Sequence, residues 1–412
     1  MEQEFYGIVR EKKEQKNINF FTLETFAGQY QCVSKISIAT LQKESHVKVT
    51  GELVAATVKK ELAVSDKEIQ VSAIEVLSTP SAIPGINIYE KDINAETSLI
   101  FDQRALTLRN EKNKCIFKIQ SYILNTFRNY LDFNGFTSIS TPKLVANGAE
   151  GGTNVFELDY FGKKAYLAQS PQLYKQIMCG VFGKVYETGP VFRAEKHASS
   201  RHLNEYTSLD VEMALKGNFQ ELIVLETDLL YSLFYDVQRK FAAEFKYLGV
   251  EFPESANPKT AVQFKVSDVK DILGTAGYDM SSMEEKEIAK YALEKNNTEF
   301  VYVTHFHRSV KPFYTKISAD EINTESFDLI YKGVEITSGG QRKENLAEYL
   351  EALKEMKMQQ EPFEGYLDAF RYGMPLHGGF AIGLERLTAL MCGLESAKAA
   401  TLFPRDVDRL TP

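Results

Sequence analysis

Residues 189–214, GPVFRAEKHASSRHLNEYTSLDVEMA, constrain the fold and the chemistry of this chain more than any other segment. The pattern predicts two β-strands around a polar loop, with Arg193 and Glu195 on the first strand and Asp210 on the second. Because residues two apart on a strand share a face, Arg193 and Glu195 should point the same way. A fixed guanidinium can grip phosphate or carboxylate oxygens with two hydrogen bonds, and a neighbouring carboxylate can accept one from an amine such as adenine N6. The alternative is a surface hairpin laced with ion pairs.

A second informative segment is GGFAIGLERL, residues 378–387, whose glycines allow a ligand to approach the backbone closely. Apolar residues then recur at helical spacing, at Leu384, Leu387, Leu390, Met391 and Leu394. Arg386 is therefore expected in the first turn of a helix with a buried apolar face, the alternative being an ion pair with Glu385 or Glu395 on the helix surface. Neither a P-loop nor a dinucleotide GxGxxG motif occurs, so phosphate recognition would rest on arginines.

Composition argues against a membrane protein, a secreted protein and a general nucleic-acid binder. With 44% hydrophobic and 25% charged residues, the 412-residue chain is typical of a globular protein of two or three domains. We expect no membrane span and no secretion, because no apolar run approaches about 18 residues and the N-terminus is charged. The four scattered cysteines suit reduced thiols in the cytoplasm. A net charge of −8 argues against a general nucleic-acid binder, although local patches could still meet RNA.

Secondary-structure patterns divide the chain into domains. Five short β-rich runs predict a five-stranded barrel of the OB-fold type over residues 1–78, and a linker over 79–105 follows. Residues 106–412 should form an α+β domain, with helices on a mainly antiparallel sheet and a small α/β insertion at about 258–325. A long amphipathic helix is expected from Asn110 to Phe133, followed by a strand that runs into Pro142.

The segment DLIYKGVEIT, residues 328–337, predicts a hairpin with Lys332 and Gly333 at its tip. A two-residue loop would pair Ile330 with Glu335, which places Asp328 diagonally across from Glu335 on the same face. Two carboxylates that converge in this way could bind Mg²⁺, which prefers one or two carboxylates completed by phosphate and water. The alternative is a solvated acidic face.

The segments 189–214 and 378–387 resemble motifs 2 and 3 of the class II aminoacyl-tRNA synthetases. LAQSPQLYKQ (167–176) and SGGQR (338–342) narrow the resemblance to the aspartyl-tRNA synthetase family of the archaeal and eukaryotic type. The resemblance covers essentially the whole chain. It implies a homodimeric ligase that joins L-aspartate and ATP into aspartyl-adenylate, with Mg²⁺ as cofactor, and transfers aspartate to tRNA(Asp).

The resemblance also implies roles for individual residues. Arg193 and Arg386 would be catalytic, and Asp328 and Glu335 would hold the metal. The residues expected to bind ATP are Arg193, Glu195, Arg201, His202, Leu203, Tyr206, Glu335, Gly383 and Arg386. The residues expected to bind aspartate are Glu150, Ser170, Gln172, Lys175, Arg193, Asp210, Ser338 and Arg342.

Charge favours aspartate over asparagine as the amino acid, because a buried β-carboxylate needs compensating positive charge and an amide does not. Lys175 and Arg342 would supply it. The alternatives are an asparaginyl-tRNA synthetase, an asparagine synthetase-like paralogue on the same domain, and, from a different class, a non-catalytic paralogue that binds nucleic acid.

The barrel departs from the family pattern. Glu24 stands where the family usually has an arginine in its anticodon-binding motif. Phe20 could still stack on an anticodon base and Gln31 could read a base edge, the alternatives being core packing and a surface amide. Elsewhere Ala149 replaces a threonine of a mobile loop, and Leu376 replaces a proline.

Overall fold

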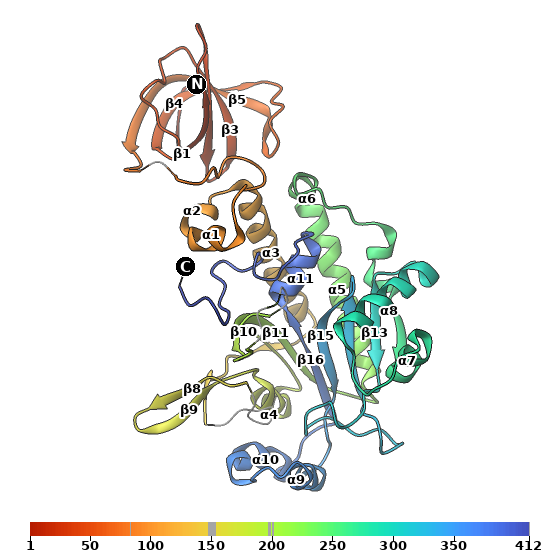
Figure 1. The fold of residues 1–412 in the computed structure, drawn as a ribbon. Helices are drawn as coiled ribbons and strands as arrows, with labels where there is room; N and C mark the ends of the chain where they lie inside the picture. The colour runs from red at the N-terminus through yellow and green to blue at the C-terminus, as the bar shows by residue number, and fades with distance from the viewer. Residues whose placement is uncertain (83, 147–153, 197–198, 200–201, 412) are drawn as a thin grey trace. The chain divides into compact units, whose positions relative to one another are not determined.

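The computed structural model describes residues 1–82, 84–146, 154–196, 199 and 202–411. The chain forms two compact units, Met1–Cys115 with Ala242–Gly249, and Ile116–Phe241 with Val250–Pro412 (Figure 1). Each unit has its own hydrophobic core, so each is described by itself.

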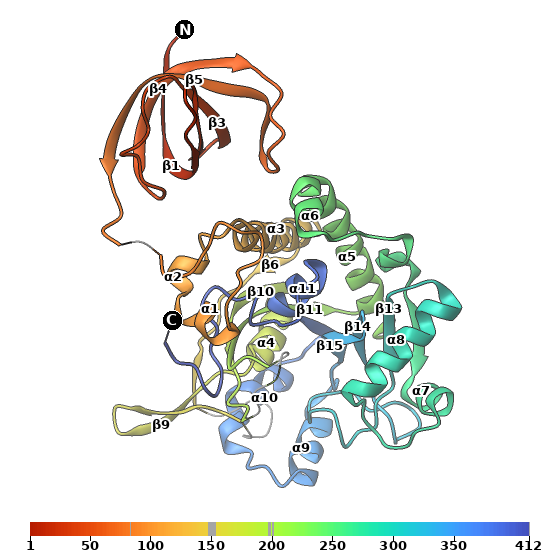
Figure 2. The same ribbon diagram turned by 45° about the horizontal axis from the view of Figure 1, so that its top comes forward.

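The first unit is built on a closed barrel with strand order β1-β2-β3-β5-β4 (Figure 2). Its strands are β1 (Gln3–Lys13), β2 (Asn19–Thr25), β3 (Gly28–Ser34), β4 (His46–Ala55) and β5 (Ala63–Ser78). Alternate residues such as Phe21 and Leu23 point into the core, as the period of a strand requires. The predicted OB-fold barrel is confirmed. Three short helices complete this unit, α1 (Thr97–Asp102), α2 (Arg104–Thr107) and α6 (Ala242–Leu248).

The second unit contains an eight-stranded sheet of order β12-β13-β14-β15-β16-β11-β10-β6. Its strands are β6 (Thr137–Ser138), β10 (Lys184–Phe192), β11 (Glu205–Ala214), β12 (Val262–Lys265), β13 (Phe300–Thr304), β14 (Ser326–Tyr331), β15 (Val334–Gln341) and β16 (His377–Gly383). A smaller sheet holds β7 (Leu144–Val145), β9 (Lys163–Leu167) and β8 (Glu157–Tyr160). The large sheet is antiparallel except where β12 meets β13 and β6 meets β10, which confirms the α+β class.

The long predicted helix is confirmed as α3 (Glu111–Phe133). The remaining helices are α4 (Gln172–Phe182), α5 (Gln220–Lys240), α7 (Val266–Leu273), α8 (Ser282–Asn296), α9 (Leu346–Glu355), α10 (Glu364–Arg371) and α11 (Leu384–Met391). The strand expected to run into Pro142 is shorter, because β6 ends at Ser138. Beyond Ser138 the chain no longer pairs as a strand. The backbone N–H and the hydroxyl of Thr141 instead donate to the side-chain carboxylate of Glu187.

The two faces of the large sheet have different roles. On one face α5 packs against the row that contains Thr337 and Tyr302, and the hydroxyls of Thr227 and Tyr302 lie 3.1 Å apart. On the other face, Asp210 lies opposite Ala381, Ala381 opposite Ser338, and Ser338 opposite Asp328. Paired residues on neighbouring strands share a face. This row therefore carries two acidic side chains and a hydroxyl across four adjacent strands.

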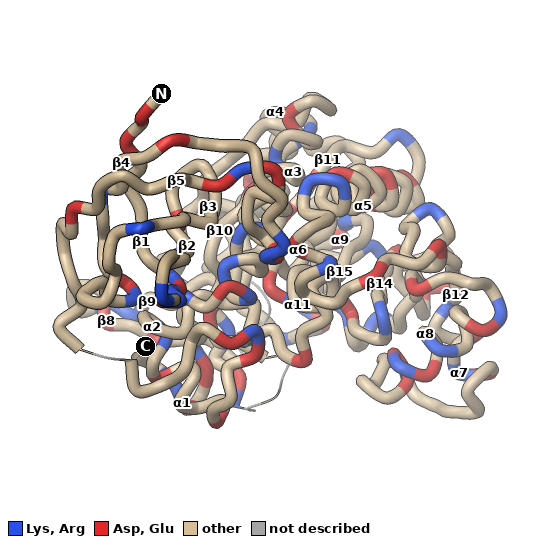
Figure 3. The backbone as a smooth tube through the Cα atoms, turned by 90° about the horizontal axis from the view of Figure 1, so that it is seen from above, with Lys and Arg blue, Asp and Glu red and all other residues tan. Residues whose placement is uncertain are grey.

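Charged residues of both signs are interspersed along individual elements. Residues of both signs occur along β1, β4 and β5 and along α8, where Figure 3 shows Lys next to Glu. Among the described residues, none of the helices combines the length and the apolar character needed to cross a bilayer.

Candidate active site

The β14–β15 hairpin aims two acidic side chains at one side of the sheet. Its tip is Lys332 and Gly333, with φ of 50° and 75°, and Ile330 pairs with Glu335 as predicted. A β-bulge at Ile336, which sequence patterns did not predict, shifts the register so that Asp328 pairs with Ser338. In a regular strand residues three apart face opposite sides, but the extra residue lets both Glu335 and Ser338 face the same pocket.

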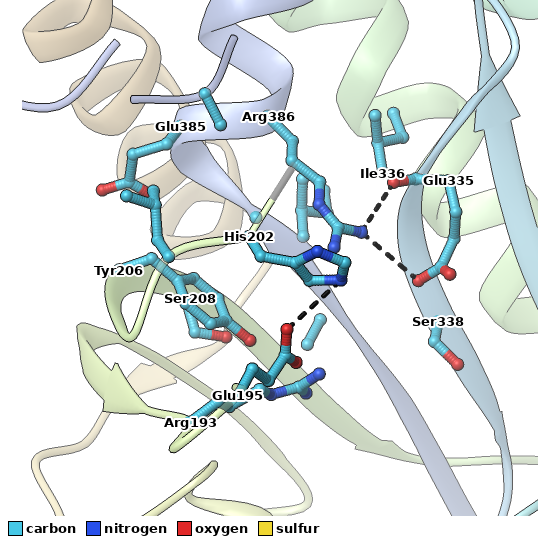
Figure 4. A pocket seen from close by; sticks show the side chains of 15 residues that line it. Arg193, Glu195, His202, Tyr206, Ser208, Glu335, Ile336, Ser338, Glu385 and Arg386 are labelled. Atoms are coloured by element: carbon cyan, nitrogen blue, oxygen red, sulfur yellow. Dashed lines mark hydrogen bonds and ion pairs between the residues drawn. The ribbon is translucent and has the colours of Figure 1, made fainter. Parts of the chain in front are cut away.

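That pocket gathers every described residue predicted to bind ATP (Figure 4). Its lining includes Arg193, Glu195, His202, Leu203, Tyr206, Glu335, Gly383 and Arg386, together with Ser338 from the predicted aspartate set. Six lining residues had no predicted role, namely Ser208, Ile336, Ala381, Ile382, Glu385 and Ala397. Arg201 lies outside the described residues. Segments more than 100 positions apart in the chain therefore converge on one pocket.

One local prediction about this pocket is wrong. Strand β10 ends at Phe192, so Arg193 and Glu195 are not strand residues. The backbone N–H of Ala194 donates to the carbonyl of Asn154 at 2.7 Å, which takes the chain away from the β10–β11 ladder. Both side chains still reach the pocket: Arg193 lies 5.7 Å from the ring centre of Tyr206, and Glu195 lies 3.2 Å from Nε2 of His202.

Each of the two predicted metal-binding carboxylates has its own cation. Arg386 donates through Nη1 to the backbone carbonyl of Glu335 at 3.0 Å, and the same atom lies 3.8 Å from Oε1 of that residue (Figure 4). Lys311 donates to Asp328 at 2.7 Å. Burial, and then the nearby negative charge of Asp328, raise the pKa of Glu335 to about 7, whereas Arg386 and Lys311 act in the opposite direction. The two carboxylates are thus close enough to repel each other.

Four buried charged residues lie beyond the pocket, namely Lys175, Asp210, Glu212 and Arg342. Their position follows from β11, on which every second residue faces the same side, roughly 7 Å per step. Tyr206 and Ser208 line the pocket, and Asp210 and Glu212 follow them on that side. Asp210 accepts from Lys175 at 2.9 Å and from Ser208 at 2.6 Å. The next alternate residue on the strand, Glu212, meets Arg342.

Arg342 and Glu212 form a two-pronged ion pair. Nε and Nη2 of Arg342 donate to the two carboxylate oxygens of Glu212 at 2.8 and 3.0 Å. Both side chains are buried. Burial disfavours the charged forms, but Arg342 and Lys175 still hold the pKa of Glu212 below its ordinary value. Gly379 makes room for this pair, because a Cβ there would lie 2.2 Å from Oε2 of Glu212. No role was predicted for Glu212, although its position two residues after Asp210 was a signal.

The remaining predicted aspartate ligands are spread around this cluster. Gln172 is buried at the start of α4, and its Nε2 has no hydrogen-bond partner among the described residues. Ser170 lines a separate pocket, whose lining also includes Tyr366 of α10. Glu150 lies outside the described residues. Lys175 also donates to the carbonyls of Val211 and Phe380 at 3.4 and 3.3 Å, so its ammonium is already surrounded by protein acceptors.

The two predicted anticodon residues lie on one face of the barrel. Phe20 pairs with Val33 and Thr22 with Gln31, so Phe20 and Gln31 share a face opposite that of Phe21. Phe20 is half-buried and outside the core cluster, and Gln31 donates to Glu68 at 2.7 Å. Glu24, the departure from the family pattern, accepts from Lys114 at 2.7 Å and pairs with Arg10. Its carboxylate is therefore committed to the unit's own ion pairs.

The chain is similar to known proteins over its whole length. Residues 96–407 match the family model described as tRNA synthetases class II (D, K and N). The chain is 42% identical to the aspartate–tRNA(Asp/Asn) ligase of Thermus thermophilus, over 100% of this chain and 97% of that protein. It is 38% identical to the aspartate–tRNA(Asp) ligase of Pyrococcus furiosus, over 98% and 95%.

Among solved structures, the asparaginyl-tRNA synthetase of Pyrococcus horikoshii complexed with asparaginyl-adenylate superimposes with a TM-score of 0.89 at 28% identity, covering 100% of this chain and 96% of that one. The fold is thus shared with enzymes for asparagine as well as aspartate. The chain belongs to the class II aminoacyl-tRNA synthetases of the aspartate, lysine and asparagine group, and the two relatives named above, matched over 97% and 95% of their length, are aspartate–tRNA ligases.

Proposed function

We propose that the protein activates L-aspartate with ATP and transfers it to tRNA(Asp). In the first step an oxygen of the aspartate α-carboxylate attacks the α-phosphorus of ATP. The bond from that phosphorus to pyrophosphate breaks, and aspartyl-adenylate forms. In the second step a ribose hydroxyl of the terminal adenosine of the tRNA attacks the carbonyl carbon, loses its proton, and AMP leaves. Neither step requires oxidation or reduction.

The observation that carries the choice of amino acid is the cluster of Lys175, Asp210, Glu212 and Arg342. Two cations and two carboxylates balance before any substrate binds. Glu212 fixes Arg342 through Nε and Nη2, and Nη1 donates to no described residue. A preoriented guanidinium edge with free donors suits a second carboxylate. Aspartate would preserve this balance, because its β-carboxylate enters together with its α-ammonium, whereas asparagine would add the ammonium alone and leave one buried positive charge uncompensated.

The polar groups nearer the pocket suit the rest of the amino acid. Asp210 accepts two hydrogen bonds, and a carboxylate offers about four acceptor sites. It therefore has capacity left for the α-ammonium of aspartate. The unsatisfied Nε2 of Gln172 is a buried donor that a substrate oxygen would satisfy. Lys175 supplies positive charge to this region through Asp210 rather than through a free donor of its own.

The nucleotide would occupy the pocket lined by Arg193, Tyr206 and Arg386. Arg193 would bind the α-phosphate and the α-carboxylate together, which holds the attacking oxygen near the phosphorus. Arg386 would bind the γ-phosphate and stabilise the leaving pyrophosphate. Tyr206 would stack on adenine, and Glu195 would accept from its amine. Catalysis of this kind depends on positioning and on fixed positive charge.

The donor set at the hairpin fits Mg²⁺. Asp328 and Glu335 face one side of the sheet and lie close enough to interact electrostatically, and Ser338, which pairs with Asp328, lines the pocket together with Glu335. The described residues hold no group of three or more side chains that could bind a metal, so nucleotide oxygens and water would complete the coordination, as Mg²⁺ prefers. The ion would neutralise phosphate charge and polarise the phosphoryl oxygens.

We also propose that the protein is a cytoplasmic homodimer that holds tRNA through the barrel. The cysteines at positions 32, 115, 179 and 392 are all buried and free, which suits a reducing compartment. Phe20 and Gln31, on one face of β2 and β3, would contact the anticodon. This barrel face carries nucleic-acid recognition in our proposal, far along the chain from the residues that bind aspartate.

ATP–pyrophosphate exchange, measured with aspartate and asparagine in parallel, tests the proposal. We expect exchange with aspartate and little with asparagine. Charging of tRNA(Asp) and tRNA(Asn) with radiolabelled aspartate then tests the second step. Exchange with asparagine alone would contradict the aspartate assignment, and binding of tRNA without any exchange would support a non-catalytic paralogue.

A further inference from the structure

A lysine that no motif includes lies at the edge of the nucleotide pocket. Lys311 comes from the segment between β13 and β14, and its ammonium donates to Oδ1 of Asp328 at 2.7 Å and to Oγ of Ser338 at 3.3 Å. The same nitrogen lies 4.0 Å from the ring centre of Phe306, a fully buried side chain. An ion pair, a hydroxyl and an aromatic face therefore fix one ammonium over the paired positions Asp328 and Ser338.

This position matters because Asp328 is one of the two carboxylates that would hold Mg²⁺. The side chains of Lys311 and Asp328 are only 11% and 13% exposed, so solvent screens their attraction weakly. A divalent ion that binds Asp328 must share its oxygens with the ammonium or displace it. The like charges of ion and ammonium also repel at such short range. In the absence of metal, the same ammonium offsets the repulsion between Asp328 and Glu335.

We propose that Lys311 is a built-in competitor of the divalent cation, and that it masks Asp328 until the nucleotide brings the metal. This inference rests on the proposed function, in which the metal arrives with ATP. Its consequence is that the nucleotide-free protein binds a divalent ion weakly. Metal and nucleotide then bind together, and the phosphate oxygens supply the affinity that Lys311 withholds. Lys311 acts through Asp328, so it is a positioning residue.

Mn²⁺ binding to the nucleotide-free, full-length protein, measured from the free-ion signal by electron paramagnetic resonance, tests this without any reaction. Lys311→Met should bind Mn²⁺ about tenfold or more tightly than the parent protein, since an adjacent charge changes the proton affinity of a carboxylate by about 10- to 1,000-fold. Lys290→Met is the matched control. Lys290 is exposed on α8 and masks no carboxylate proposed to bind the metal, so its loss should leave Mn²⁺ binding unchanged.

A double-mutant cycle with Asp328→Asn decides the mechanism. Asp328→Asn should change Mn²⁺ binding little in the parent protein, where Lys311 masks the carboxylate, but should abolish the gain in Lys311→Met. Lys311→Gln, with a thermal melt to verify folding, repeats the measurement with a polar side chain. Unchanged or weaker Mn²⁺ binding by both Lys311 variants, or a gain that survives Asp328→Asn, would overturn the proposal. If the parent protein showed no aspartate-dependent ATP–pyrophosphate exchange, the proposed function would be overturned instead, whatever the Mn²⁺ result.

Discussion

Individual side chains in the site depend on partners that no short motif contains. Arg342 was predicted from SGGQR, but its orientation comes from Glu212, 130 positions earlier in the chain. Asp328 was predicted from the hairpin, but its cation is Lys311 from an irregular segment. Sequence patterns identify residues that a ligand would touch. They do not identify the neighbours that hold those residues, because these pairings form only when distant strands come into register.

At this scale the metal proposal makes a direct prediction. Glu335→Gln keeps the shape of the side chain but removes its charge, so Mg²⁺-dependent adenylate formation should weaken. The loss in apparent Mg²⁺ affinity should be at least the roughly 10- to 100-fold seen when even a group that supports a metal ligand is removed. Higher Mg²⁺ should recover part of it. The measurement is the exchange rate as a function of Mg²⁺ concentration.

The matched control is Glu294→Gln, on an exposed position of α8, which should leave the Mg²⁺ dependence unaltered. A Glu335→Gln protein with the same Mg²⁺ dependence as the parent would exclude Glu335 as a metal ligand.

Helices and strands were predicted well where a hydrophobic periodicity runs through many residues, and less well at their ends. The amphipathic pattern gave α3 to within one residue of its start, and the alternation of the first 75 residues gave the barrel. The bulge at Ile336 and the end of β10 at Phe192 left no such pattern. At the end of β10 the backbone N–H of Ala194 donates to the carbonyl of Asn154, and beside the bulge the backbone N–H of Glu335 donates to the carboxylate of Glu285 at 3.1 Å. Both partners lie in distant segments, and both irregularities affect where side chains of the site point.

Helix α5 buries a carboxyl group beneath the catalytic sheet. Both oxygens of Glu226 are buried without a hydrogen-bond partner among the described residues, beside Thr337 and Tyr302. Burial raises the pKa of Glu226 from 4.5 to about 8. The folded form therefore holds a proton that the unfolded chain releases above pH 4.5. Stability from this group is complete below pH 4.5 and is lost as the pH rises toward 8, at about 1.4 kcal/mol per pH unit.

Glu226→Gln should remove this dependence, because the amide stays neutral. Relative to the parent protein, the free energy of unfolding of the variant should rise between pH 5 and pH 8, measured by urea denaturation at each pH. Other groups that titrate in this range cancel in the difference. A difference that stays constant across the range would show that Glu226 is ionised in the folded protein.

In our proposal the two units of the molecule have separate tasks. The barrel would recognise tRNA, whereas the residues proposed to bind ATP and aspartate all lie in the second unit. Removing residues 1–85 should therefore preserve aspartate-dependent exchange and sharply reduce tRNA charging. Phe20→Ala alone should cost roughly the 1–3 kcal/mol of a lost base–aromatic stack, read from the KM for tRNA.

The control for Phe20→Ala is Phe26→Ala, because Phe26 is fully exposed in the turn between β2 and β3 and has no proposed contact. A truncated protein that charged tRNA at the full rate would assign recognition elsewhere, and the barrel would then have only a structural role.

In our proposal Arg342, a preoriented arginine, selects aspartate by its second carboxylate. The most direct test is kcat/KM for exchange with aspartate and with asparagine, in the parent protein and in Arg342→Leu. Breaking a buried ion pair costs about 3–5 kcal/mol, or roughly 10²- to 10⁴-fold at 1.4 kcal/mol per tenfold. Because both amino acids are tested on one protein, any loss of stability cancels in their ratio. Arg371→Leu, which removes an arginine from a partly exposed ion pair, is the control. We expect the preference for aspartate to collapse in Arg342→Leu and to persist in Arg371→Leu; an unchanged preference in Arg342→Leu would show that Arg342 does not select the amino acid.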